Sequence, residues 1–191
     1  MIKYSIVSLG EYIGVLGEND FRTLIKNFKV SKDADVEEFL GKSALIFDKE
    51  NISKTYLILN MDNKDECRNE LAGYFSISNN KTIDIKALSK KSKKNFFGGA
   101  AGFIERDTEG AFLIGQLARN DSYSKQELPG EVILNEIYKI ISDLVSKAGG
   151  RIIVLECKSK LKAYYELKGF KYVKTSEERL DLLIRSTDGM I

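Results

Sequence analysis

One stretch of the sequence constrains the fold more than any other, because the pattern of an amphipathic helix runs directly into that of a buried strand. Residues 129–148 carry apolar side chains at the 3.6-residue spacing of a helix, namely Ile133, Ile137, Ile140, Ile141 and Leu144. Pro129 and Glu131 suit the start of this helix, and Gly149 with Gly150 suits its end. The apolar run of residues 152–155 predicts a strand covered on both faces of a parallel or mixed sheet. This order predicts an α/β domain.

Strand and helix patterns alternate through the rest of the chain. Strand patterns fall at residues 3–9, 55–60, 71–78, 111–117, 170–174 and 179–185. The second and third of these would pair as an antiparallel hairpin. Helical spacing marks residues 34–49, after the caps Ser31 and Asp33, and residues 159–168, between the cap Ser159 and the terminator Gly169.

Size and composition favour one folded domain. The 191 residues can bury a sizeable core, and no flexible linker divides them, so we expect a single domain over residues 1–191. Glu11 interrupts the first apolar stretch, which is therefore unlike a signal peptide. No window reaches the roughly 18 consecutive apolar residues of a membrane helix. We expect a soluble, cytoplasmic protein without a membrane partner.

The reactive side chains narrow the chemistry. The sequence has no histidine, which removes His-based triads and His metal ligands. Cys67 and Cys157 lie far apart without CxxC spacing, so we expect buried thiols and no metal site. Proton transfer would have to use Tyr, Glu, Asp, Lys, Cys or water.

A lysine cluster is the one strongly charged feature in a chain of formal net charge +2. Residues 83–102 predict a short basic helix and then a small-residue loop near the substrate cleft; the lysines are Lys86, Lys90, Lys91, Lys93 and Lys94. They suit either a solvated face, which we favour, or contacts to RNA phosphates. The loop at residues 98–102 lacks the Gly-Lys-Ser/Thr ending of a phosphate-binding loop.

Three segments in order resemble the core of the GNAT N-acetyltransferase family. They read AFLIGQLARNDSY at residues 111–123, PGEVILNEIYKIISDLVSKAGGRIIVLECK at 129–158, and AYYELKGF at 163–170. Upstream, FKVSKDADVEEFL (28–40), SKTYLIL (53–59) and LAGYFSIS (71–78) resemble the toxin-like or phage-type subgroup. The resemblance implies the GNAT fold, with a mixed central β-sheet of about six or seven strands flanked by helices.

The resemblance also implies acetyl-coenzyme A (acetyl-CoA) as cofactor and places its site. The pantetheine arm would pair with the main chain of Leu117, Ala118 and Arg119. The helix start at Gly130 and Glu131 would receive the pyrophosphate. Tyr165 would act as the general acid that protonates the departing thiolate. The general base stays open among Glu105, Asp107, Asp121 and water.

The loop before the helix departs from the family pattern. SKQELPG at residues 124–130 keeps only the last glycine of that pattern, and Lys158 or Ser159 replaces an asparagine that often follows the fifth strand. Glu127 and Glu131 would repel pyrophosphate, while Lys125 and Arg119 would offset them.

Three functions remain open at this stage. The first is acetyl transfer to a primary amine of a small molecule or peptide by a direct ternary-complex mechanism. The second is toxin-type acetylation of aminoacyl-tRNA, with tRNA as a partner. The third is a non-catalytic acyl-CoA-binding or interaction protein. A homodimer is a further expectation.

Overall fold

The computed structural model describes residues 1–62, 70–86, 88–97 and 106–189. The chain divides into two compact units, each made of two stretches. The first unit comprises Met1–Ile77 and Gly115–Ile137, and the second comprises Ser78–Ile114 and Tyr138–Ile191. The single domain over residues 1–191 stays a prediction.

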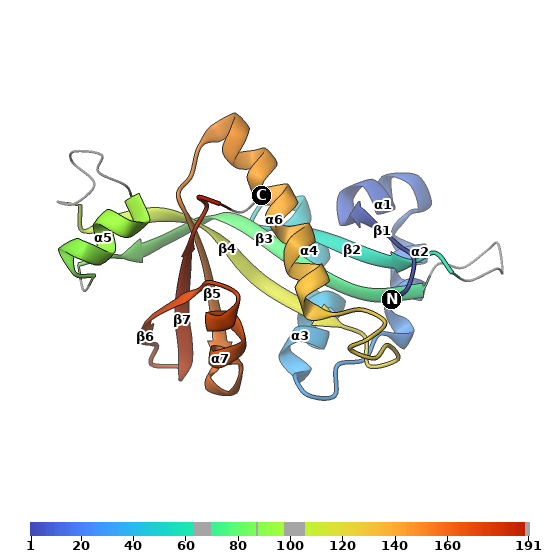
Figure 1. Cartoon of the computed structure of the whole chain (residues 1–191). Coiled ribbons are helices and arrows are strands. Elements are labelled where there is room, and N and C mark those ends of the chain that lie inside the picture. Colours follow the sequence, from blue (N-terminus) through green and yellow to red (C-terminus); the bar gives the residue numbers. More distant parts are fainter. Residues whose placement is uncertain (63–69, 87, 98–105, 190–191) are drawn as a thin grey trace. The chain divides into compact units, whose positions relative to one another are not determined.

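Seven strands form one mixed sheet in the order β1-β2-β3-β4-β5-β7-β6 (Figure 1). Their bounds are Tyr4–Ser8 (β1), Lys54–Asn60 (β2), Glu70–Asp84 (β3), Thr108–Arg119 (β4), Ile152–Lys158 (β5), Lys171–Thr175 (β6) and Leu180–Ser186 (β7). The β4–β5 pair is parallel, whereas β1–β2, β2–β3, β5–β7 and β6–β7 are antiparallel. The α/β class and the mixed sheet of six or seven strands are confirmed.

Three of the helical segments begin after a residue type that favours a helix start, namely α1 (Leu9–Leu16), α2 (Glu18–Leu24) and α3 (Ala34–Glu38). The others are a 3₁₀ turn (Ile25–Asn27), a π-helical segment (Phe39–Ser43), α4 (Ala44–Lys49), α5 (Lys90–Phe97), α6 (Gly130–Ala148) and α7 (Ser159–Leu167). Ser8 and Glu11 form a capping box that ends β1 and starts α1. The helix expected over residues 34–49 is present with Asp33 at its N-cap, although its middle is π-helical.

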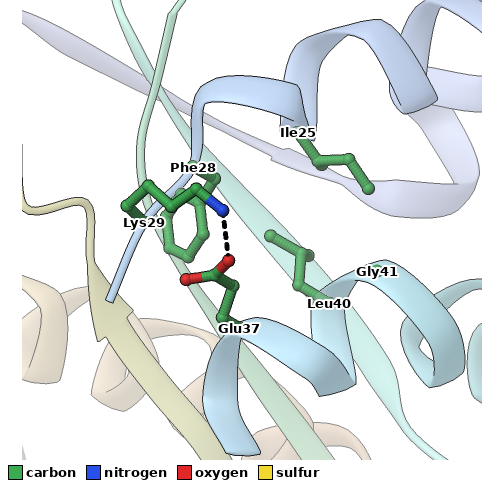
Figure 2. Close-up of a pocket in the computed structure, with 6 residues that line it drawn as sticks. All are labelled: Ile25, Phe28, Lys29, Glu37, Leu40 and Gly41. Carbon is green, nitrogen blue, oxygen red and sulfur yellow. Dashed lines mark hydrogen bonds and ion pairs between the residues drawn. The ribbon is translucent and has the colours of Figure 1, made fainter. Parts of the chain in front are cut away.

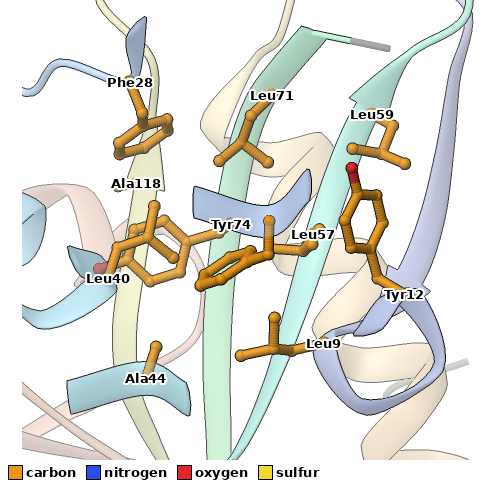
Figure 3. Close-up of a cluster of buried hydrophobic side chains, with 11 residues drawn as sticks. Leu9, Tyr12, Phe28, Leu40, Ala44, Leu57, Leu59, Leu71, Tyr74 and Ala118 are labelled. Atoms are coloured by element: carbon orange, nitrogen blue, oxygen red, sulfur yellow. The ribbon is translucent and has the colours of Figure 1, made fainter. Parts of the chain in front are cut away.

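The core of the first unit surrounds Tyr74 of β3 (Figure 3). Its ring is fully buried and meets Phe28 edge-on, with 5.5 Å between the ring centroids. Leu40, Leu57 and Ala118 belong to the same cluster. Each large side chain buried in this way contributes about 1.5–3 kcal/mol. This cluster holds the end of β4 against the N-terminal helical segments.

The second unit has its own core on β3, β4, β5, β7 and α5. Its buried members are Ile83, Ile85, Phe96, Ala111, Ile152, Val154, Leu182 and Ile184. The fully buried run of residues 152–154 confirms the predicted strand covered on both faces.

Two local expectations are wrong. β3 extends to Asp84, six residues past its expected end, because Ile83 is buried in the core although polar residues surround it in sequence. The N-cap of α7 is Lys158 and not Ser159, since Lys158 has the extended backbone of a cap and Ser159 is already helical. The expected loop at residues 98–102 lies outside the described residues.

Candidate active site

The carboxyl end of β4 supplies the first part of the candidate site. Within the described chain, β4 pairs with β5 from Phe112 to Ile114, yet it continues to Arg119. The Ala118 carbonyl oxygen is turned towards β3, because a Cβ added at Gly73 would meet it at 2.8 Å. Strand residues alternate in direction, so the main-chain groups of Leu117 and Arg119 point away from β3. These are the groups that an added strand-like ligand would meet.

Asn120 fixes the chain where β4 ends. Its side chain is buried and donates to the carbonyl oxygens of Leu71 at 3.0 Å and Asn27 at 3.3 Å. Its side-chain oxygen accepts from the main-chain N–H groups of Lys29 at 3.4 Å and Ser122 at 3.2 Å. One side chain thereby holds together β3, the segment after α2 and the β4–α6 loop.

Asp121, at the surface, also connects the β4–α6 loop to the segment after α2. Its carboxylate accepts the main-chain N–H of Ser31 at 2.6 Å, and its own N–H donates to the Lys29 carbonyl at 2.8 Å. The main-chain hydrogen bond from Ser31 is the largest cause that lowers the pKa of Asp121. A lowered pKa makes this carboxylate a weak base, so the structure favours a positioning role for it over the general-base role that the sequence left open.

The β4–α6 loop folds onto itself before the helix. The Glu127 carboxylate accepts the main-chain N–H of Ser124 at 2.7 Å, and the Ser124 hydroxyl accepts that of Glu127 at 3.2 Å. The Arg119 guanidinium donates to the Leu128 carbonyl oxygen at 3.0 Å. Lys125 is exposed, with no ion-pair partner among the described residues. Gly130 and Glu131 form the first turn of α6, where N–H groups lack intrahelical acceptors.

A small pocket opens in the first unit beside the segment that Asn120 holds (Figure 2). Its volume is about 140 Å³, and its lining is Ile25, Phe28, Lys29, Glu37, Leu40 and Gly41. The Lys29 ammonium and the Glu37 carboxylate form an ion pair at 2.6 Å across it. The hydrogen bond from Lys29 is the largest cause that lowers the pKa of Glu37. The pocket therefore combines apolar side chains with one ion pair.

Tyr165 lies on α7 in the second unit. Its ring is 9% exposed and meets the rings of Tyr164 at 5.2 Å and Phe170 at 5.8 Å, both edge-on. Burial is the main cause that raises its pKa, with smaller contributions from Cys157, Tyr164 and Tyr138. Its hydroxyl has no hydrogen-bond partner among the described residues. The phenol is therefore protonated at neutral pH, the form that a general acid requires.

The remaining expectations concern the base, the thiols and metals. Asp107 is 61% exposed and pairs with Lys86 at 3.4 Å, while Glu105 and Cys67 lie outside the described residues. Cys157 is a buried free thiol, as predicted, and burial raises its pKa to about 11. In the described parts of the chain no group of three acidic or cysteine side chains could hold a metal ion. Those parts also contain no helix that combines the length and apolar character needed to cross a membrane.

Two polar groups of the first unit were missed from the sequence. Asn120 is one of them. The other is Tyr123, whose buried hydroxyl donates to Glu70 at 2.8 Å and accepts from Asn60 at 3.1 Å. A polar residue directly after an apolar strand, as at Asn120, was the available signal.

Neither a protein-family profile nor a curated protein matches the sequence. Solved structures match over almost the whole chain. A tyrosine-to-phenylalanine mutant of KacT matches with a TM-score of 0.74 and 19% identity, over 98% of this chain and 97% of that chain. AtaT complexed with acetyl-methionyl-tRNAfMet matches with a TM-score of 0.74 and 16% identity, over 98% and 97%.

A tyrosine-to-phenylalanine mutant of the toxin AtaT, bound to the C-terminus of the antitoxin AtaR and acetyl-CoA, matches with a TM-score of 0.66. The identity is 13%, over 98% of this chain and 95% of that chain. These likenesses establish the fold: the chain has the GNAT fold, as its sequence predicts. Among proteins of this fold, it is similar to KacT and to the toxin AtaT.

Proposed function

We propose that this protein is an N-acetyltransferase that uses acetyl-CoA to acetylate a primary amine in a direct ternary complex. The observation that carries the proposal is the match to AtaT bound to acetyl-CoA, over 98% of the chain, together with a buried tyrosine at the position that the GNAT resemblance assigns to the acid. The cofactor supplies an activated acetyl group as a thioester.

The residues of the first unit fit such a carrier chemically. Leu117 and Arg119 direct main-chain groups away from β3 and would pair with the pantetheine amides. Ala118 would contribute to this site by holding Leu117 and Arg119 in place on either side of it in β4. The N–H groups at Gly130 and Glu131 and the Lys125 ammonium would face the pyrophosphate, since helix N-termini and ammonium groups stabilise anions. Glu127 accepts the main-chain N–H of Ser124, which holds the carboxylate in the loop without removing its negative charge.

The proposed reaction needs one proton donor and one proton acceptor. The amine nitrogen would attack the thioester carbon, a main-chain N–H of β4 would stabilise the oxyanion, and the C–S bond would break. The thiolate would take the Tyr165 proton, and the amine proton would leave to water or to a carboxylate. Because burial raises the pKa of Tyr165, its protonated form persists across the neutral range.

Tyr165→Phe is the decisive variant. It should lower kcat by about 10²- to 10⁴-fold, as for loss of a general acid, and leave the KM for acetyl-CoA almost unchanged. The fold should survive, because the hydroxyl makes no hydrogen bond to the described residues. Release of coenzyme A thiol in the presence of an amine gives the rate. Tyr164→Phe, at a neighbouring ring that is 36% exposed, is the matched control. Equal rates for both variants would remove Tyr165 from the mechanism.

We further propose that the amine is borne by aminoacyl-tRNA. This finer assignment is supported by the likeness to AtaT solved with acetyl-methionyl-tRNAfMet. Induced expression should stop bacterial growth, and the Tyr165→Phe variant at the same protein level should not. Wild-type expression that is harmless, from a protein that turns over acetyl-CoA with a small amine, would restrict the acceptor to small molecules or peptides.

A non-catalytic acyl-CoA-binding role is the alternative, favoured by the altered loop at residues 124–130. It predicts that acetyl-CoA raises the melting temperature without any turnover. An antitoxin and a second copy of the chain remain candidate partners; AtaT has been solved with the C-terminus of its antitoxin AtaR.

A further inference from the structure

Arg185 lies on the face of β7 that is turned away from α5, within the second unit. Leu182 and Ile184 of the same strand belong to the buried cluster that contains Phe96 of α5. Because side chains alternate along a strand, Arg185 points to the other face. Its main chain pairs with that of Ile153 on β5. The side chain is half-buried and forms no ion pair with a carboxylate of the described residues, so its charge is balanced in another way.

The first contact of the Arg185 guanidinium closes the C-terminal end of α7. Its Nη1 donates to the main-chain carbonyl oxygen of Lys168 at 2.8 Å. The last carbonyl groups of a helix lack intrahelical donors and form the negative end of the helix dipole, so a cation there is stabilising. Gly169 follows with a φ of +86°, and a Cβ at this position would lie 3.6 Å from the Arg185 Nε. The guanidinium therefore lies along the turn that ends α7.

The same turn is bonded to the main chain of Tyr165. The Tyr165 carbonyl oxygen accepts the N–H groups of Lys168 at 2.9 Å and of Phe170 at 3.1 Å. The Phe170 ring also meets the Tyr165 ring edge-on, with 5.8 Å between the centroids. A shift of this turn would therefore move both the backbone of Tyr165 and a ring that packs against its side chain.

The second contact of the guanidinium is with Tyr138 of α6. The Cζ of Arg185 lies 4.5 Å from the centroid of the Tyr138 ring, which is a cation–π geometry. The Tyr138 hydroxyl is buried and has no hydrogen-bond partner among the described residues, so the ring is the part of this side chain that forms the contact. Tyr138 also lies close enough to Tyr165 to contribute, after burial, to the raised pKa of that residue. Arg185 thus joins α7 to a ring beside Tyr165.

We propose that Arg185 is a positioning residue for Tyr165: it ties the end of α7 to the Tyr138 ring and thereby holds the Tyr165 hydroxyl in one orientation for proton donation. This inference rests on the proposed function, in which Tyr165 is the acid. The Tyr165 hydroxyl has no hydrogen bond to a described residue, so its orientation depends on packing. A displacement of about 1 Å can cost about 10²-fold in rate, which makes that packing important for turnover.

A double-mutant cycle in kcat tests this role in the full chain, with release of coenzyme A thiol in the presence of an amine as the rate. Arg185→Met should lower kcat about 10- to 100-fold and leave the KM for acetyl-CoA within about twofold. In the Tyr165→Phe background the same change should lower kcat by less than about twofold, because the group that Arg185 positions is already absent. A merely structural role would lower kcat equally in both backgrounds. Arg22→Met, the same exchange at an exposed position of α2, is the matched control.

Milder variants keep the test valid if Arg185→Met does not fold. Arg185→Lys retains a cation that can donate to the Lys168 carbonyl oxygen, although it loses the planar group, and should lower kcat less than about fivefold. Tyr138→Leu removes the ring that the guanidinium contacts and should lower kcat at least about fivefold more than Tyr138→Phe, which keeps the ring. Equal rates for Tyr138→Leu and Tyr138→Phe would contradict the contribution of that ring.

An NMR measurement separates this inference from the proposed function. In protein labelled with ring-¹³C tyrosine, the signals lost in Tyr165→Phe are those of Tyr165. Arg185→Met should shift or broaden these signals, and Arg22→Met should not. This result with no acetyl transfer by the wild type would refute the proposed function and leave the positioning of Tyr165 standing. Unchanged Tyr165 signals in Arg185→Met, or equal losses of kcat in both backgrounds, would overturn the inference and leave acetyl transfer by the wild type intact.

Discussion

At the scale of single residues, the first unit depends on Asn120 more than its size suggests. Four hydrogen bonds converge on this buried side chain. Asn120→Ala should lower the free energy of unfolding by about 3 kcal/mol, because each buried group left without a partner costs about 1–3 kcal/mol. Urea denaturation measures the loss. Asn135→Ala, at an exposed position of α6, should stay within about 0.5 kcal/mol of wild type. A loss below about 1 kcal/mol at Asn120 would mean that water replaces its bonds.

The sequence could single out Tyr165, Gly130 and the β4 residues as candidates because their neighbours in sequence resemble a family pattern, and their roles stay predictions. It could not predict the role of Asn120, whose partners Leu71, Lys29 and Asn27 are 49, 91 and 93 residues away. The same holds for the hydrogen bonds of Tyr123, whose partners Asn60 and Glu70 lie 63 and 53 residues before it. Single polar residues acquire such roles only when the sheet brings distant segments together. A local pattern can mark the position of Asn120, but it does not identify the partners.

At the scale of elements, the connection from α6 to β5 shows what a local pattern can and cannot specify. Two consecutive glycines predict the end of α6, and both have positive φ, +75° at Gly149 and +127° at Gly150. Their surroundings differ. A Cβ at Gly150 would meet the Phe112 ring of β4 at 2.4 Å, whereas a Cβ at Gly149 would have no neighbour within 4 Å. The close approach of β4 is invisible in the sequence.

This contrast gives a matched pair of variants. Gly149→Ala should cost about 1–2 kcal/mol, the strain of a left-handed residue with a Cβ. Gly150→Ala should cost about 1–3 kcal/mol more, because a packed ring must be displaced in addition to the backbone strain. The difference in urea midpoint between the two variants, at equal m-values, measures the packing of Phe112 against the turn. Equal midpoints would show that the ring moves aside freely.

At the scale of the whole molecule, burial of tyrosine is the most widespread electrostatic feature. Seven of the nine tyrosines have a raised pKa, and burial is the largest cause for each: Tyr4, Tyr12, Tyr56, Tyr74, Tyr123, Tyr138 and Tyr165. For Tyr4 and Tyr123 the pKa reaches about 12. The folded chain thus keeps phenolic protons that the unfolded chain releases near pH ~10.

Stability should therefore fall steeply in alkali. Below pH ~10 both states hold the phenolic protons, so the stabilisation is fully present. As the pH rises through 10 towards 12, the folded state binds more protons than the unfolded state, and the free energy of unfolding decreases. Tyr165→Phe should make this decrease shallower by up to about 1.4 kcal/mol per pH unit. Urea titrations between pH 9 and 11 measure both slopes, and parallel slopes would show that the Tyr165 hydroxyl is hydrated in the folded protein.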